Sequence, residues 1–141
     1  MSETDLELSF NIACTLEISF DLETFTRKIL HLRQITQGSF EFTFVDRDTI
    51  KELNQAHLDH DYVTDIITFN LGSTDDIVGD VYICAPHAKD NADHYGQVFD
   101  DEIRLLIIHG ILHLLNYQDY TDDERAVMDA EQRRLLAGAR Q

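Results

Sequence analysis

The chain has 141 residues, of which 43% are hydrophobic, so it is long enough for one globular domain with a buried core. Its 27 acidic and 11 basic residues give a formal net charge of −16, which argues against a nucleic-acid partner held mainly by Lys and Arg. No apolar run approaches the roughly 18–20 residues that cross a bilayer, and the acidic residues 1–7 do not resemble a secretory signal. Cys14 and Cys84 have apolar neighbours and no ligand-like spacing, which is typical of buried thiols in a reducing cytoplasm.

The first half of the chain predicts two strands and two helices. Apolar and polar residues alternate over 6–12 and again over 40–44, as in half-buried strands. Between them, Asp21 is a typical helix cap, and apolar residues follow it at helical spacing. After the second strand, Asp46 or Asp48 begins a short helix. Its inner residues are expected to be Ile50 and Leu53, with Ala56 as a third candidate.

The second half predicts two more strands and three helices, the last of which opens with a capping box. The expected ranges are 65–71 and 77–85 for the strands, and 87–95, 99–115 and 121 onward for the helices. Asn116 should end the middle helix in the left-handed conformation. The last helix should bury Val127, Met128 and Leu135. This order predicts an α+β fold for a single domain covering residues 1–141, with a mixed sheet of about four strands covered by helices.

The helix expected over 99–115 carries two histidines, His109 and His113, within an apolar run. Positions four apart on a helix lie only about 40° apart around its axis, so both imidazoles leave the same face. Asp119 follows the expected helix end and can fold back as a third ligand. Three protein ligands with one open position are typical of a catalytic zinc site. The spacing therefore predicts a metal site formed by His109, His113 and Asp119.

The same residues allow other interpretations. A buried apolar helix can hold two core histidines that hydrogen-bond to backbone groups without a metal. If Asp119 does not reach the ion, His57 and His60 are the next ligand candidates. Zinc proteases with similar ligand spacing carry Glu after the first histidine as general base, whereas this chain has Gly110. The pattern thus argues for a metal site and against peptidase chemistry.

Four ordered segments share a pattern with one known family. Residues 109–119 read HGILHLLNYQD, where the family has roughly HGxLHLxGYDH. Partial matches upstream are Leu53-Asn54, Asp61, Thr64-Asp65-Ile66-Ile67-Thr68-Phe69, Gly79-Asp80-Val81 and Glu102. On these residues the chain resembles the YbeY family, bacterial metal-dependent endoribonucleases involved in ribosomal RNA maturation. The resemblance covers about residues 40 to 136.

Two departures from the family pattern affect its chemistry. The third ligand is Asp119 where the family has His, so the site carries one more negative charge and suits iron, manganese or nickel as well as Zn²⁺. Leu58 stands where the family has an Arg that is thought to hold phosphate. Leucine cannot bind a phosphate oxygen, so Lys51, Arg104 or His60 would have to compensate.

Further residues are candidates for supporting roles. Asp65, Asp80 or Glu102 could orient a ligand histidine, although each also suits an ordinary cap or surface charge. A local basic patch would have to be built from few residues, which are more typical of solvated helix faces. These are Arg27, Lys28, Arg33, Arg104, Arg125, Arg133 and Arg134.

The resemblance implies a metal-dependent, single-strand-specific endoribonuclease that acts on ribosomal RNA in small-subunit maturation and ribosome assembly, with Zn²⁺ as the expected cofactor. A second hypothesis is a non-catalytic or weakly catalytic assembly factor that binds basic ribosomal proteins or a GTPase. The acidic composition and Leu58 favour this second hypothesis. A third is a metallohydrolase of another substrate. Each of the three predicts a cytoplasmic protein with no membrane partner.

Overall fold

The computed structural model describes residues 5–58 and 64–140. Its strands and helices are β1 (Leu6–Ile12), α1 (Leu22–Leu32), β2 (Gly38–Val45), α2 (Arg47–Leu58), β3 (Ile66–Asn70), β4 (Val78–Cys84), α3 (Ala85–Tyr95), α4 (Phe99–Leu114) and α5 (Asp122–Ala139). The predicted elements are confirmed, in the predicted order. None of the helices in the described ranges has the length and apolar character that a membrane span requires.

The four strands form one mixed sheet in the order β1-β2-β4-β3. β1, β2 and β4 run parallel, and β3 pairs antiparallel with β4 as an edge strand. Parallel neighbours need long connections, and α1 supplies the one between β1 and β2. The α+β fold with a four-stranded mixed sheet is therefore as predicted.

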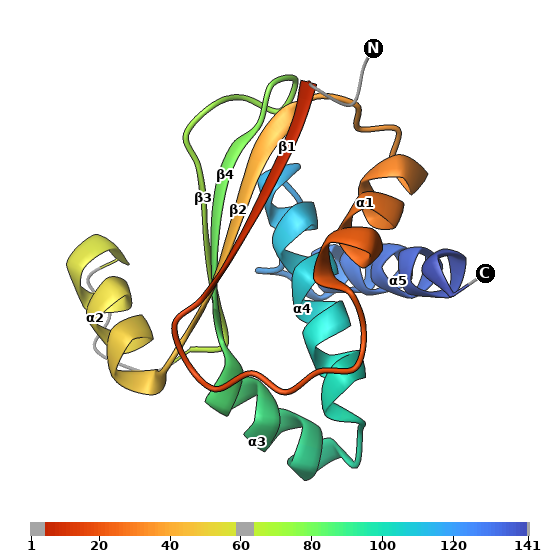
Figure 1. Ribbon diagram of the computed structural model, residues 1–141. Coiled ribbons are helices and arrows are strands. Elements are labelled where there is room, and N and C mark those ends of the chain that lie inside the picture. The colour runs from red at the N-terminus through yellow and green to blue at the C-terminus, as the bar shows by residue number, and fades with distance from the viewer. Residues whose placement is uncertain (1–4, 59–63, 141) are drawn as a thin grey trace.

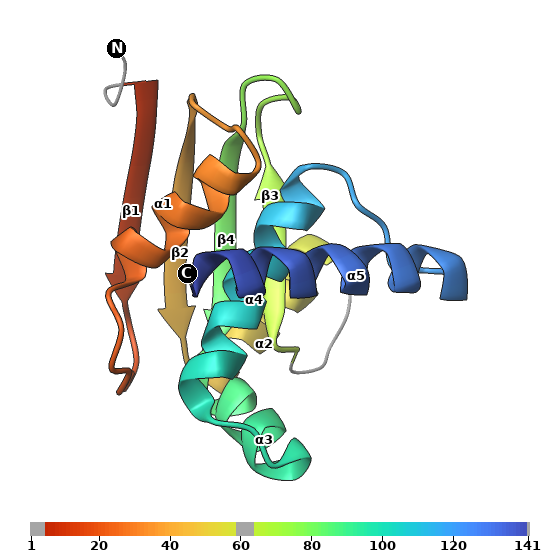
Figure 2. The ribbon, with the colours of Figure 1, turned by 90° about the vertical axis from the view of Figure 1, so that its right-hand side faces the viewer.

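Helices cover the two faces of the sheet unequally. α1, α4 and α5 lie on one face, α2 lies alone on the other, and α3 sits below the end of the sheet (Figure 1). The main core fills the space between the sheet and α1, α4 and α5, and it includes the fully buried Phe42, Ile29 and Ile107. A smaller core lies under α2 around Ile50 and Cys84. Figure 2 shows α5 crossing the helix layer, with its first turns extending past β3.

Side-chain caps fix where α1, α2 and α5 begin. The backbone amide of Thr24 donates to Asp21 Oδ1 at 2.8 Å, and the amide of Thr49 donates to Asp46 Oδ1 at 2.8 Å. Asp46, rather than Asp48, is therefore the cap of α2. The predicted capping box of α5 is present between Thr121 and Glu124.

Two predictions about inward-facing residues are wrong. Val127 in α5 is 61% exposed, whereas Met128 and Leu135 are buried as expected. Ala56 in α2 is exposed, whereas Ile50 and Leu53 pack against the smaller core as expected. Each helix buries only a narrow stripe, α2 against the sheet and α5 against α1 and α4, so apolar residues just beside the stripe face solvent.

Glycines let α4 approach the sheet closely. A Cβ atom at Gly110 would lie 3.0 Å from Val81 Cγ1 and 3.2 Å from Ile66 Cδ1. At the end of the same helix, a Cβ at Gly79 of β4 would lie 2.5 Å from Leu114 Cδ1. Gly110 therefore faces β3 and β4, and its place in the sequence is explained by packing.

Candidate metal centre

The three predicted ligands lie together at the end of α4. The Nε2 atoms of His109 and His113 are 2.9 Å apart, because the two residues are one helical turn apart on the same face. Asp119 Oδ2 lies 3.5 Å from His113 Nε2 and 3.9 Å from His109 Nε2. Asn116 adopts a φ of 74°, the left-handed conformation predicted for it. This conformation reverses the chain after α4 and so brings Asp119 back toward the two histidines.

Hydrogen bonds at the other ring nitrogens determine which atoms of the histidines face the centre. His113 Nδ1 lies 3.1 Å from the carbonyl oxygen of Tyr117, which can only accept, so Nδ1 carries the proton. His109 Nδ1 lies 2.7 Å from Gln132 Oε1 of α5 and donates to it in the same way. In the neutral rings both Nε2 atoms then hold lone pairs, and these point toward each other and toward a carboxylate.

Two imidazole nitrogens and a carboxylate oxygen thus direct lone pairs at one point with no hydrogen atom between them. This arrangement favours the binding of a cation. Ligands at about 2.0–2.2 Å from a tetrahedral ion would be separated by about 3.3 Å, close to the three observed separations. Burial, and then the neighbouring His109, lower the pKa of His113, so its ring is neutral at pH 7 and available as a ligand. The residues present fit a divalent metal ion, and His109, His113 and Asp119 could hold it.

The ligands line a pocket of about 380 Å³ that we call the metal pocket. Its lining residues are Asn54, Thr64, Asp65, Ile66, Ile67, Thr68, His109, His113, Asp119 and Tyr120. The lining is rich in hydrogen-bonding groups, but it contains no Lys or Arg within residues 5–58 and 64–140. A phosphate group in this pocket would thus meet hydroxyl, imidazole and carboxylate groups, and a bound metal ion would be the main positive charge.

Arg125 holds the loop that carries Asp119, the third predicted ligand. Its Nη1 donates to the carbonyl oxygens of Asp119 at 3.1 Å and of Tyr120 at 3.2 Å. The sequence named Arg125 only as a candidate for a basic patch and did not single out Gln132, because both act through contacts that no local spacing reveals. Gln132 lies 23 residues beyond the histidine it orients.

The predicted supporting residues fall in different places. Asp65 lines the metal pocket. Glu102 lies on α4 close to Asp65; burial, and then the Asp65 carboxylate, raise the pKa of Glu102. Asp80 lies opposite Glu41 in the sheet and alternates with Val81, which packs under α4, so Asp80 faces away from the histidines. The prediction that Asp80 could orient a ligand histidine is wrong.

Of the alternative ligands and cations, those within the described residues lie away from the centre. His57 packs against the ring of Phe69 on the α2 side of the sheet. Arg104 pairs with Asp101 at 2.8 Å and stacks on Phe20 in a separate pocket, so it does not compensate for Leu58. Lys51 is not among the described residues that line the metal pocket. His60 and Asp61 lie outside the described residues, and Leu58 is the last residue of α2.

The candidate basic residues are mostly neutralised by acidic neighbours. Six ion pairs account for the arginines among them: Arg27–Glu23, Arg33–Glu131, Arg104–Asp101, Arg125–Asp122, Arg133–Asp129 and Arg134–Glu131. Lys28 donates to the carbonyl oxygen of Ala139 at 3.4 Å. These residues therefore stabilise helix surfaces and contacts, as expected for solvated helix faces.

Comparison with known proteins gives the family. A family model described as Endoribonuclease YbeY matches residues 10–140. The Endoribonuclease YbeY of Phocaeicola vulgatus is 41% identical over 100 residues, which cover 71% of this chain and 72% of that protein. The one from Flavobacterium psychrophilum is 31% identical over 131 residues, which cover 89% and 91%.

A solved structure agrees with these relatives. The solution structure of a Thermotoga maritima protein superposes with a TM-score of 0.68 at 29% identity, covering 92% of this chain and 88% of that one. The sheet, the helix that carries the histidines and the sequence matches therefore point to the same group of proteins, as the resemblance predicted. The chain belongs to the Endoribonuclease YbeY family.

Proposed function

We propose that this protein is a metal-dependent endoribonuclease that cleaves single-stranded segments of ribosomal RNA during small-subunit maturation. The observation that carries the proposal is the convergence of two imidazole nitrogens and a carboxylate oxygen in an open pocket of a chain from this family. The chain would act as one domain over residues 1–141, in the cytoplasm. The free thiols of Cys14 and Cys84 suit that compartment.

His109, His113 and Asp119 would hold the ion, and Zn²⁺ is the expected one because two imidazoles and a carboxylate form a common catalytic zinc set. When bound, the ion supplies Lewis-acid chemistry toward a phosphoryl oxygen and makes water a better nucleophile. The Asp119 carboxylate reduces the net positive charge of the centre compared with a third histidine. That reduction moves the optimum for water activation to higher pH.

The chain's own groups would orient the substrate and the ligands. Gln132 and the Tyr117 carbonyl keep each imidazole turned with Nε2 toward the pocket. Thr64 and Thr68 offer hydroxyl groups to phosphate and ribose oxygens. Asp65, an acidic group in the pocket, is available to accept a proton from an attacking nucleophile.

The proposal is tested by metal content and cleavage measured together. We expect purified protein to carry about one equivalent of zinc by mass spectrometry and His113→Ala to carry much less. Wild type should cut a structured ribosomal RNA fragment in its loops, and chelator-treated protein should not. Equal, negligible metal in both proteins would contradict the metal site, and metal-independent cutting would contradict the mechanism.

A second candidate function is a non-catalytic ribosome-assembly factor that binds basic ribosomal proteins or a GTPase. The net charge of −16 and the absence of cationic side chains from the described pocket lining favour it. Here the metal would only stabilise the turn after α4. Retained binding to small-subunit particles, with no metal-dependent difference in cleavage, would favour this function over the endoribonuclease.

A further inference from the structure

An exposed aromatic residue stands beside the proposed metal ligands. Tyr120 follows Asp119 directly and lines the metal pocket. It is 81% exposed, whereas tyrosines commonly pack most of their ring against the protein. A large, solvated ring at the edge of a polar pocket is available to contact a ligand that enters it.

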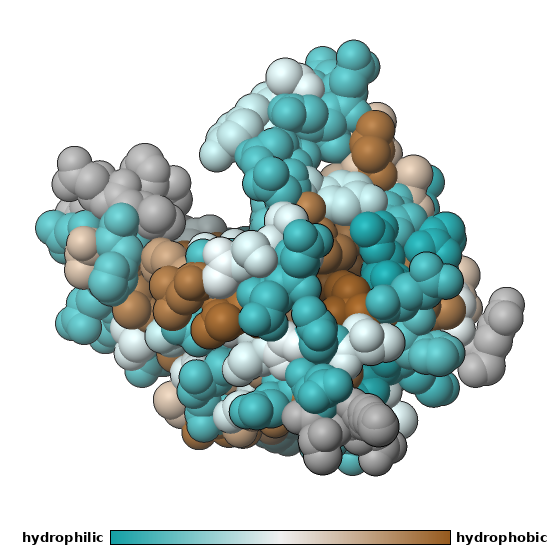
Figure 3. All heavy atoms as spheres, turned by 90° about the horizontal axis from the view of Figure 1, so that it is seen from above, coloured by the Kyte–Doolittle hydropathy of each residue, from teal (hydrophilic) through white to brown (hydrophobic). Residues whose placement is uncertain are grey.

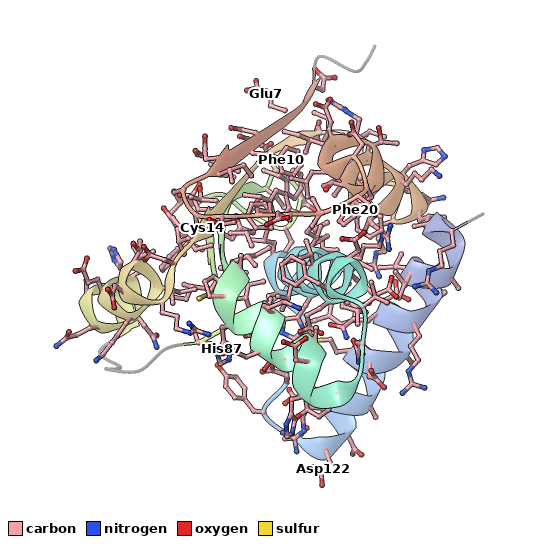
Figure 4. All side chains as sticks on the ribbon, turned by 60° about the horizontal axis from the view of Figure 1, so that its bottom comes forward. Glu7, Phe10, Cys14, Phe20, His87 and Asp122 are labelled. Carbon is pink, nitrogen blue, oxygen red and sulfur yellow. The ribbon has the colours of Figure 1, made fainter. Side chains whose placement is uncertain are left out.

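The backbone around Tyr120 is fixed although its ring is free. Arg125 holds the carbonyl oxygens of Asp119 and Tyr120 at 3.1 Å and 3.2 Å. The next residue, Thr121, is fixed by the capping box with Glu124, through hydrogen bonds of 2.9 Å and 3.1 Å. Asp122 then begins α5 at the end that projects from the molecule (Figure 4). A ring on such a rigid support loses little conformational freedom when a partner binds.

The described lining of the pocket lacks the cationic side chains that usually bind RNA phosphates. Within the part of the chain that the structure describes, no Lys or Arg lines it. Stacking of bases on aromatic rings is the main alternative to phosphate contacts in recognition of single-stranded nucleic acid. Stacking does not require a positive protein surface, so it suits a chain with a net charge of −16.

We propose that Tyr120 stacks on an unpaired RNA base and thereby holds the adjoining phosphodiester against His109, His113 and Asp119. The inference rests on the proposed endoribonuclease function and names the residue that selects its substrate. A base inside a duplex already stacks on its neighbours and has no free face, so the same ring discriminates against paired RNA.

The chain contains no tryptophan, which allows a direct test. In Tyr120→Trp the new indole is the only tryptophan, and base stacking quenches its fluorescence. The probe is an RNA of about ten alternating A and C nucleotides, which cannot pair with itself, compared with its duplex with the complement. The matched control is Tyr95→Trp, since Tyr95 is also exposed at 69% but does not line the metal pocket.

We expect the single strand to quench the tryptophan fluorescence of Tyr120→Trp and the duplex to leave it unchanged. The fluorescence of Tyr95→Trp should respond to neither RNA. Tyr120→Ala should bind the single strand about 10-fold more weakly and raise KM with little change in kcat, whereas Tyr120→Phe stays within about twofold of wild type. Zinc content should be equal in all of these proteins, because the Tyr120 side chain is not a ligand.

The outcomes separate this inference from the proposed function. Quenching without any cleavage supports the stacking role and contradicts the endoribonuclease. The stacking role is overturned if wild type cleaves RNA, the fluorescence of Tyr120→Trp is not quenched and Tyr120→Ala binds the single strand as wild type does. That result would leave the endoribonuclease function intact. Equal quenching by single strand and duplex also overturns it, since stacking would then not select unpaired bases.

Discussion

The orientation of each ligand histidine depends on a hydrogen bond to its Nδ1 atom. For His113 the acceptor is a carbonyl four residues away, and for His109 it is the Gln132 side chain on another helix. An imidazole that loses such a partner can rotate or change tautomer, and both changes remove the lone pair from the centre. The two rings therefore differ in how easily a mutation disturbs them.

Replacement of Gln132 by alanine should weaken metal binding. His109 would lose the acceptor at 2.7 Å that keeps its Nε2 deprotonated, and such changes typically lower metal affinity about 10- to 100-fold. Competition with a chromogenic chelator measures the affinity. Gln55→Ala, at an exposed position of α2, is the control and should bind as wild type does. Unchanged affinity in Gln132→Ala would mean that this hydrogen bond does not orient the ring.

The residues of the centre show which features the sequence could reveal. His109, His113 and Asp119 were predictable because the helical repeat and a single reversal at Asn116 bring them together. Gln132 and Arg125 were not, because their roles depend on where α5 packs after the chain turns. Pairwise contacts between distant helices leave no periodic signal in one sequence.

At the level of elements, α4 is held close to the sheet by a glycine. A Cβ at Gly110 would lie 3.0 Å from Cγ1 of the fully buried Val81 and 3.2 Å from Cδ1 of Ile66. The sequence pattern singled out Gly110 as a missing catalytic base, but its position is explained by helix–sheet packing.

Gly110→Glu should unfold the protein rather than create a peptidase. The carboxylate would be forced against Val81 and Ile66 without a partner, at a cost of several kcal/mol, comparable to the whole stability of a small domain. Gly110→Ala should cost about 1 kcal/mol, as overpacking outweighs the gain in helix propensity. Thermal melts followed by circular dichroism measure both. A Gly110→Glu protein that melts like wild type would show that α4 can move away from the sheet.

The contact between α1 and α5 includes an ion pair through Glu131, in addition to apolar packing such as that of Leu32 on Gly138. The Arg134 guanidinium hydrogen-bonded to Glu131, together with Arg33 of the α1 cap, holds the pKa of Glu131 at about 2, below its usual 4.5. Arg33 also donates to the Tyr117 hydroxyl at 2.8 Å, and the Tyr117 carbonyl orients His113. One ion-pair network thus joins two helices to the turn that carries a ligand.

Glu131→Gln should therefore destabilise the protein in a pH-dependent way. Because the pKa of Glu131 is lower in the folded state, its contribution is complete above about pH 4.5 and is lost as the pH falls toward 2. After allowance for the solvent exposure of Arg134, we expect the free energy of unfolding to fall by about 2 kcal/mol at pH 7 and by less than half of that at pH 3. Urea denaturation at both pH values measures the difference, and an equal loss at both would contradict the shifted pKa.

For the whole molecule, charge governs the encounter with RNA. The formal charge is −16, and the face in Figure 3 is mostly hydrophilic, with apolar residues in scattered patches. A polyanionic substrate is repelled at long range by such a surface, and salt screens the repulsion. This is the reverse of the usual nuclease, in which a basic surface attracts RNA and salt weakens binding.

The rate of cleavage should accordingly rise with salt. Between 10 mM and 150 mM monovalent salt the screening length falls from about 30 Å to about 8 Å, so kcat/KM for a short single strand should increase several-fold. Stopped assays at constant free metal measure it. A small aryl phosphodiester with one charge serves as control and should respond weakly. A tenfold fall for the RNA would reveal a basic contact surface outside the described pocket lining.

All three proposed ligands come from one short stretch of chain, since Asp119 is only ten residues beyond His109. Such a stretch would remain a chelating peptide when the protein is unfolded, so a cation would bind both the folded and the unfolded states. The cation would then raise the melting temperature less than its affinity for the folded state alone would suggest. During synthesis the four strands leave the ribosome before the first of these histidines. Metal capture by the growing chain can therefore precede the docking of α5, and with it the arrival of Gln132.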